Sequence, residues 1–208
     1  MTRVLAVADE VSESLENGLL PELRPDVILG CGDLPFEYLE YLVSRSNVPV
    51  LYVPGNHDPA LKPPDPLWSG TTARGAGVGA QGCINVDGRI ETVAGLRIAG
   101  LGGSIRYREG PNQYTQAQMT RRALALELRV RLSRHRVDVL ITHSPPFGHH
   151  DSDDPAHIGF TSLNPLVERL RPRILFHGHV LQYGPTAAEE RVGTTLIVNA
   201  IPYRLLEM

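Results

Sequence analysis

Five short apolar runs, each followed within a few residues by Asp, Asn or His, constrain the fold of this chain more than any other feature. The runs are rich in valine, isoleucine and leucine, which is typical of strands buried on both faces. They cover residues 3–8, 27–29, 50–53, 137–142 and 174–176. Apolar residues at helical spacing in 12–23 and 35–44 separate the first three runs. This alternation of strands and helices predicts an α/β fold.

The length and composition of the chain favour a single domain. The 208 residues are ample for one buried core and short for two. Hydrophobic residues make up 42% and charged residues 21%, which is ordinary for a globular protein. Neither a repeat nor a clear boundary divides the chain, so we expect one domain over residues 1–208.

The chain after residue 58 contains further regular elements. Short strands are expected at 83–86, 89–93 and 96–101, and Asp87–Gly88 is a dipeptide typical of a hairpin turn. Before them, the proline- and glycine-rich residues 59–82 predict a long loop. Shorter patterns predict a helix over 165–171 and strands over 195–198 and 203–207.

A long helix is predicted over residues 115–136. Leu124, Leu128 and Leu132 recur every four residues, and six arginines lie between Arg121 and Arg136. Two interpretations follow: a solvated basic face on an amphipathic helix, or a docking face for an anionic partner.

Charge and cysteine content exclude several classes of protein. The formal net charge is -3 and the pI is about 6.2, which argues against nucleic acid as a partner, because gripping phosphates needs a basic excess. Cys31 and Cys83 can form neither a disulfide framework nor a zinc motif, which suits a reducing compartment. Neither signal-peptide features nor an apolar run of about 20 residues is present, so we expect a cytoplasmic protein without a membrane span.

Polar side chains that suit a metal site follow each of the five buried strands. In open α/β sheets, functional groups gather outside the carboxyl ends of the strands. Hard divalent ions bind carboxylate, amide oxygen and imidazole ligands, all of which occur here. The strand-end groups are Asp9, Gly32–Asp33, Gly55–Asn56–His57–Asp58, His143 and Gly178–His179. Cys31 could be a nucleophile among these groups, or a buried neighbour of Asp33.

These five blocks, in this order, resemble the signature of the calcineurin-like metallophosphoesterases. Gly102–Gly103–Ser104 and residues 145–148 also resemble loops of that family. The resemblance spans residues 9–179 and implies a four-layer αββα sandwich of two mixed sheets flanked by helices. It further implies hydrolysis of a small phosphorylated substrate, either a phosphomonoester or a phosphodiester, with one or two divalent ions (Mn, Fe or Zn) as cofactor.

The resemblance also implies a role for each strand-end residue. Asp33 is expected to bridge two ions, which activate a water for attack on phosphorus. His57 is expected to donate a proton to the leaving oxygen or to contact the phosphate, and Asp58 to orient His57. Of the other ligands, Asp9 is expected on the first ion, and the second ion is expected to bind Asn56, His143 and His179.

Two positions depart from the family pattern. Val11 and Leu181 stand where the family has histidines that serve the first ion, so this site is depleted while the ligands of the second ion are intact. Three hypotheses follow. Other residues rebuild the two-metal site, the enzyme uses one ion, or the protein is a non-catalytic regulator that binds phosphate or nucleotide.

Two further segments offer candidate residues. Glu10 and the polar residues 149–157 could rebuild the first site, or the latter could be a solvated loop. The candidate replacement ligands in that stretch are His149, His150, Asp151 and His157. Arg106 could bind a substrate phosphate with its planar guanidinium, or lie in a polar surface loop.

Overall fold

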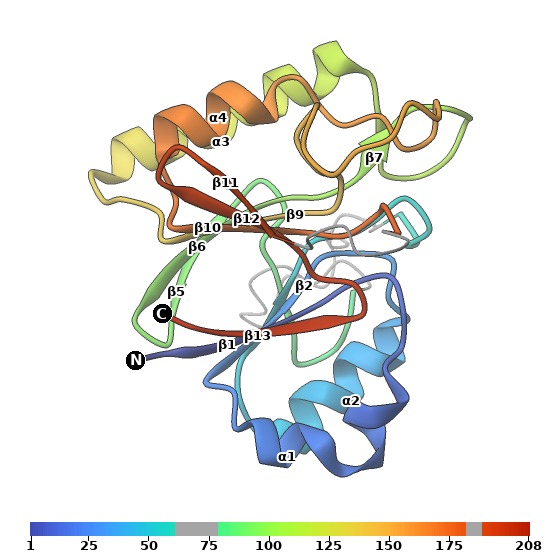
Figure 1. Cartoon of the computed structure of the whole chain (residues 1–208), viewed down its shortest axis with the longest axis vertical. Helices are drawn as coiled ribbons and strands as arrows, with labels where there is room; N and C mark the ends of the chain where they lie inside the picture. Colours follow the sequence, from blue (N-terminus) through green and yellow to red (C-terminus); the bar gives the residue numbers. More distant parts are fainter. Residues whose placement is uncertain (61–78, 182–188) are drawn as a thin grey trace, which may run out of the picture.

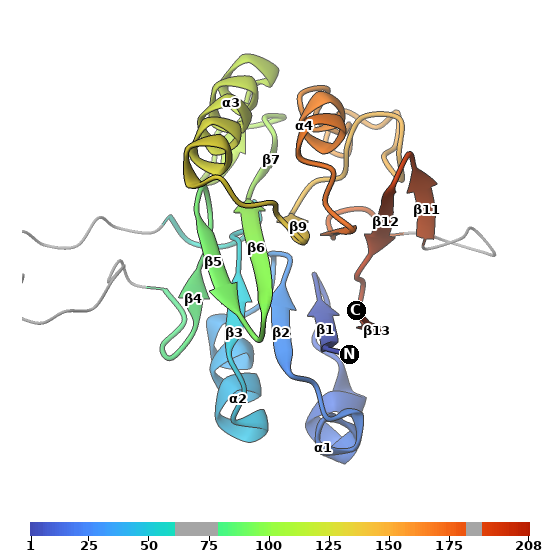
Figure 2. The same ribbon diagram turned by 90° about the vertical axis from the view of Figure 1, so that its left-hand side faces the viewer.

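Two β-sheets face each other in the computed structural model, with helices on both outer sides (Figure 1). The structure describes residues 1–60, 79–181 and 189–208. Figure 2 shows α1 and α2 beyond one sheet, and α3 and α4 beyond the other. The predicted four-layer αββα sandwich is therefore confirmed. Within the described ranges, no helix is long and apolar enough to cross a membrane.

The first sheet has the strand order β13-β1-β2-β3-β4. Its four parallel strands are β1 (Arg3–Val7), β2 (Val27–Gly30), β3 (Val50–Tyr52) and β4 (Ile84–Asn85). The edge strand β13 (Tyr203–Glu207) is antiparallel to β1. The irregular turn η1 (Leu15–Leu19) and the helices α1 (Leu20–Leu23) and α2 (Phe36–Ser46) cover its outer face.

The second sheet has the strand order β11-β12-β10-β9-β6-β5. Its parallel strands are β6 (Leu96–Leu101), β9 (Val139–Thr142), β10 (Ile174–His177) and β12 (Thr195–Asn199). The antiparallel edge strands are β5 (Ile90–Val93) and β11 (Glu189–Val192). The helices α3 (Gln116–Ser133) and α4 (Leu163–Leu170) cover this sheet, and β7 (Ser104–Ile105) pairs with β8 (Gln113–Tyr114) beside it.

The main core lies between the two sheets. Val4, Leu29 and Leu51 of the first sheet pack with Ile141 and Phe176 of the second, and all five are buried. Separate apolar clusters join each sheet to its own helices. Because both faces of each sheet are covered, the central strands are continuous apolar runs, which explains why they are visible in the sequence.

Three local predictions need correction or fall outside the structure. The helix predicted over 12–23 is interrupted, because Gly18 has a φ of 111°, and α1 begins only at Leu20, with Pro21 in its first turn. Asp87–Gly88 is not a hairpin turn: β4 pairs with β3 in the first sheet, and β5 pairs with β6 in the second. The chain changes sheets there, and the Asp87 carboxylate accepts a hydrogen bond from Gly102 N. Of the predicted loop, residues 61–78 lie outside the described residues.

Candidate metal centre

All five strand-end motifs lie at carboxyl ends of parallel strands, and contacts between them join the two sheets. His143 follows β9 of the second sheet, and its Nδ1 lies 2.8 Å from the carbonyl oxygen of Cys31, which follows β2 of the first. The backbone N–H of His179 donates to Asp9 Oδ2 at 2.9 Å, which connects the ends of β10 and β1. The site therefore lies where the carboxyl ends of both sheets meet.

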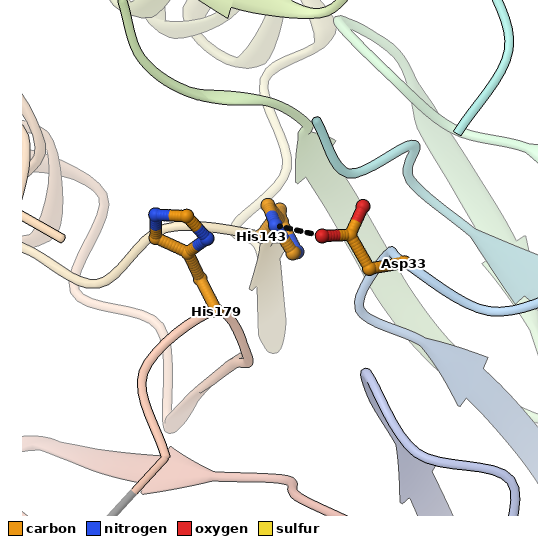
Figure 3. A group of neighbouring side chains, drawn as sticks. All are labelled: Asp33, His143 and His179. Carbon is orange, nitrogen blue, oxygen red and sulfur yellow. Dashed lines mark ion pairs between the residues drawn. The ribbon is translucent and has the colours of Figure 1, made fainter. Parts of the chain in front are cut away.

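Asp33, His143 and His179 form the centre of this site (Figure 3). One potential ligand atom from each lies within 4.8 Å of the others. His143 Nε2 is 3.2 Å from Asp33 Oδ2 and 3.0 Å from Asn56 Oδ1. His143 is fully buried, and Asn56 and His179 nearly so. Together these side chains supply two imidazoles, a carboxylate and an amide oxygen.

The hydrogen bonds of the two imidazoles fit a cation between them. A carbonyl oxygen can only accept, so Cys31 O fixes the proton of His143 on Nδ1 and leaves a lone pair on Nε2. His179 Nε2 lies 2.8 Å from Ala156 O, which leaves Nδ1 as its lone-pair atom, and Figure 3 shows this nitrogen toward His143. These lone pairs share the site with the oxygens of Asp33 and Asn56. The nitrogen and oxygen atoms that carry these lone pairs repel one another unless a proton or a metal ion lies between them. The residues therefore fit a divalent ion.

The pKa values of the ion-free site reflect the close approach of these side chains. Burial alone would lower the pKa of His143, but the neighbouring Asp33 carboxylate outweighs it and raises this pKa to about 9. Burial would conversely raise the pKa of Asp33, but His143 outweighs it and the net shift is downward. Burial lowers the pKa of His179 to about 3, so that ring is a neutral ligand at physiological pH. Without an ion, His143 therefore carries a second proton, and its positive charge balances the negative charge of Asp33.

Asp9 lies beside the centre but outside the group that converges on it. Burial raises the pKa of its carboxyl to about 6, and its Oδ2 already accepts from the His179 backbone. Val11 and Leu181 are exposed, at 40% and 45% of their surface. Among the His, Cys, Asp and Glu residues that the structure describes, ligand atoms converge only at Asp33, His143 and His179. The geometry thus gathers the residues expected for the second ion.

Glycines let these loops approach each other closely. A Cβ added at Gly178 would collide with the carboxylate of Asp9, and one at Gly55 with that of Asp33. Asp9, Asp33 and His179 have φ values of 60°, 55° and 70°, a left-handed conformation uncommon for residues other than glycine. Such strain is held only where the surrounding contacts enforce it, and it often occurs at functional sites.

Replacing Gly178 by Ala is expected to disturb the site through this collision. Overpacking of this kind typically costs about 1–3 kcal/mol of unfolding free energy. Gly110→Ala is the matched control, because its added Cβ would meet only the end of the flexible Gln113 side chain. Urea unfolding of both variants measures the difference, and equal stability of the two would contradict the expectation.

His57 and Asp58 occupy the loop after β3 with different surroundings. The His57 side chain is 63% exposed, and its Nε2 lies 4.0 Å from Asp33 Oδ2 at the rim of the site. Asp58 is buried, and its Oδ2 accepts from Gly55 N at 2.7 Å and Asp33 N at 3.1 Å. Among the described contacts, the Asp58 carboxylate thus holds the backbone of two loops rather than the His57 ring. Burial raises its pKa to about 6.

The four candidate replacement ligands separate into different environments. His149 Nδ1 lies 3.0 Å from Glu190 Oε2, and His150 Nδ1 lies 2.9 Å from His177 Nε2. The Asp151 carboxylate accepts from the backbone N–H groups of Gly148 and Gly159, each at 3.0 Å, and so shapes its own loop. His157 is the candidate placed beside the centre, with its ring 5.1 Å from that of His179.

The loop after β7 contributes a residue that the sequence did not single out. Tyr107 is one residue beyond Arg106, and its hydroxyl lies 3.4 Å from the Asn56 amide nitrogen. Asn112 Nδ2 also donates to the carbonyl oxygens of Gly55 and Asp58, which fixes the loop that carries Asn56. The sequence signal that could have indicated Tyr107 is the cluster of polar and aromatic residues after Gly102–Gly103. Arg106 itself donates to Gln113 O and Gln118 Oε1, and its role toward substrate stays a prediction.

Cys31 contributes its backbone carbonyl to the site. Its thiol is fully buried, and burial raises its pKa far above the ordinary value. A thiol that stays protonated is a poor nucleophile, so the interpretation as a buried neighbour of Asp33 is favoured.

Comparison with known proteins identifies the family. Residues 33–204 match the family model of the metallophosphoesterases of the calcineurin superfamily, which covers most of the chain. The protein therefore belongs to this family, and its fold and its group of metal-ligand residues agree with that membership. None of the curated proteins matches the chain.

Solved structures share the fold at low sequence identity. One crystal structure aligns with a TM-score of 0.64 and 19% identity, over 95% of this chain and 90% of its own. TT1561 of Thermus thermophilus aligns with a TM-score of 0.63 and 20% identity, over 96% and 88% of the two chains. GAP50, the anchor in the inner membrane complex of Plasmodium, gives 0.52 and 12%, over 95% and 70%. At these identities the likeness concerns the fold alone.

Proposed function

We propose that this protein is a phosphoesterase that hydrolyses a small phosphomonoester or phosphodiester with one tightly held divalent ion. The observation that carries the proposal is the convergence of Asp33, His143 and His179, with Asn56 Oδ1 also within 3.0 Å of His143 Nε2. These four side chains would hold the ion. A divalent ion bound there would neutralise charge on a phosphoryl oxygen and lower the pKa of a bound water. Mn, Fe and Zn all suit such ligands.

The surrounding residues support a place for the substrate. A hollow of about 370 Å³ adjoins the centre. It is lined by the polar residues Asp33, Glu37, His57 and Asp58 and by the apolar residues Leu34, Pro35, Phe36 and Pro59. His57 is exposed there and could donate a proton to the leaving oxygen, while Pro35 and Phe36 offer apolar contacts to an aromatic leaving group. Tyr107 and Asn112 fix Asn56 and its loop, so they would position a ligand rather than react.

Metal content and turnover test this function together. Elemental analysis of protein purified without chelator should give about one ion per chain, since one ligand group converges. Hydrolysis of p-nitrophenyl and bis-p-nitrophenyl phosphate should depend on that ion and return when Mn²⁺ is added to chelator-treated protein.

A different metal content, or an absence of turnover, would favour one of the rival hypotheses. Two ions per chain would mean that the first site is rebuilt, and His157 beside His179 would be the residue to replace. An ion without any turnover of phosphate esters would favour a regulator that binds phosphate or nucleotide. Absence of an ion after Mn²⁺ addition would overturn the proposal.

A further inference from the structure

The helix α3 exposes a row of leucines on its outer face. Leu124, Leu128 and Leu132 are 51%, 57% and 73% exposed, although they lie within an 18-residue helix. The residues of α3 that face the protein are instead Met119, Ala123, Leu126, Glu127 and Val130. Residues four apart lie on the same side of a helix, so the leucines form one stripe about 12 Å long. We call Leu124, Leu128 and Leu132 the leucine stripe.

The surface beside the leucine stripe is hollowed. Leu124 borders a hollow of about 260 Å³ between α3 and α4, which Pro165 and Leu166 also line. Figure 2 shows these two helices side by side as an outer layer of the molecule. A larger hollow, of about 600 Å³, lies at the carboxyl ends of both helices. The stripe therefore adjoins, at Leu124, a hollow that could receive a large side chain.

The charge around the stripe is strongly positive. Residues 116–136 contain six arginines, one of which, Arg122, is paired with Asp87. They contain a single acid, Glu127, which is buried and paired with Arg131 and Arg169. Five arginines and one exposed acid, Glu168, line the second hollow; the arginines are Arg131, Arg134, Arg136, Arg169 and Arg171. The chain as a whole carries a net charge of -3, so this positive charge is a local feature of the α3–α4 surface.

We propose that the leucine stripe and its arginine border dock an acidic amphipathic helix of a partner protein. Apolar anchors at one-turn spacing match the way helices bind to grooves. Charge complementarity selects the partner, because acidic residues beside its leucines would face the arginines. A second copy of this chain fits poorly, since pairing two α3 helices would place arginines against arginines, and Glu127, the sole acid of α3, is buried. This docking is independent of hydrolysis at the metal centre.

A displayed library of amphipathic helices tests both the surface and the charge. The library fixes leucines on one face, for helices of about three turns, and randomises the flanking positions among Glu, Gln and Lys. It is selected on the wild-type protein and counter-selected on Leu124→Gln/Leu128→Gln/Leu132→Gln, since Gln keeps the helix propensity of Leu. Sequences flanked by Glu should be enriched. A synthetic peptide from the selection should lose at least about tenfold in affinity on Leu128→Gln, and should bind more weakly at high salt.

Control variants and self-association complete the test. Ile84→Thr changes an exposed apolar residue of β4, outside the surface, and should leave peptide affinity unchanged. Thermal unfolding monitored by circular dichroism should show that the triple variant remains folded. Enrichment of Lys-flanked or uncharged helices, or no discrimination between wild type and triple variant, would overturn the proposal. So would light scattering that shows a wild-type dimer dispersed by the triple variant, which would assign the stripe to a second copy.

Discussion

Replacing Asp33 by Asn is expected to abolish both metal binding and hydrolysis. Asn keeps the shape of the side chain and an oxygen that can still accept from His57 N, as Asp33 Oδ1 does at 2.7 Å. It removes the negative charge that lies 3.2 Å from His143 Nε2. Changes in residues that merely support a metal ligand already cost roughly 10–100-fold in affinity, so loss of a charged ligand should cost at least about 100-fold. Turnover should fall by about 1000-fold.

Asp138→Asn provides a matched control for this variant. Asp138 precedes β9, at the opposite end of the sheet from the centre, and its Oδ2 also accepts from a backbone N–H, that of Arg97 at 2.8 Å. The chemical change is identical, so a general effect of losing a carboxylate would appear in both variants. Calorimetric titration of Mn²⁺ into each chelator-treated protein gives the affinity of each variant for the ion. Unchanged affinity in Asp33→Asn would remove Asp33 from the metal centre.

Replacing His57 by Ala should lower turnover by about 10²–10⁴-fold while the ion remains bound. His57 is exposed at the rim of the hollow beside Asp33, outside the converging ligand group, so its loss leaves the ion's ligands in place. The loss should depend on the leaving group. A proton donor matters more for phenyl phosphate than for p-nitrophenyl phosphate, because the phenolate is the more basic leaving oxygen.

The role of His57 is tested by comparing the loss of turnover between the two esters and between two histidine variants. Equal losses for both esters would assign His57 to contact with the phosphate instead of proton donation. His135→Ala is the control, because His135 is an exposed histidine at the end of α3 whose Nδ1 lies 2.6 Å from Ser133 O. It should keep full activity. Loss of the ion in His57→Ala would contradict a role restricted to the substrate.

The sequence by itself determined the strands and the polar groups at their ends. Buried strands of parallel sheets must be apolar on both faces, so the runs that became β1, β2, β3, β9 and β10 are visible without any tertiary information. Their polar end residues were therefore known to share an edge of a sheet. Asp33, His143 and His179 do converge, as that pattern indicated.

Only the tertiary structure decided how the individual side chains are used. The ring of His143 is oriented by the Cys31 carbonyl, a contact between residues 112 positions apart, and no local pattern encodes such a contact. For the same reason, sequence could not separate His157, which pairs with Asp154 and lies beside His179, from His149 and His150, which pair with Glu190 and His177. Periodicity likewise revealed that the leucines of α3 share one face, but which face points inward depends on how the whole helix packs against the sheet and α4.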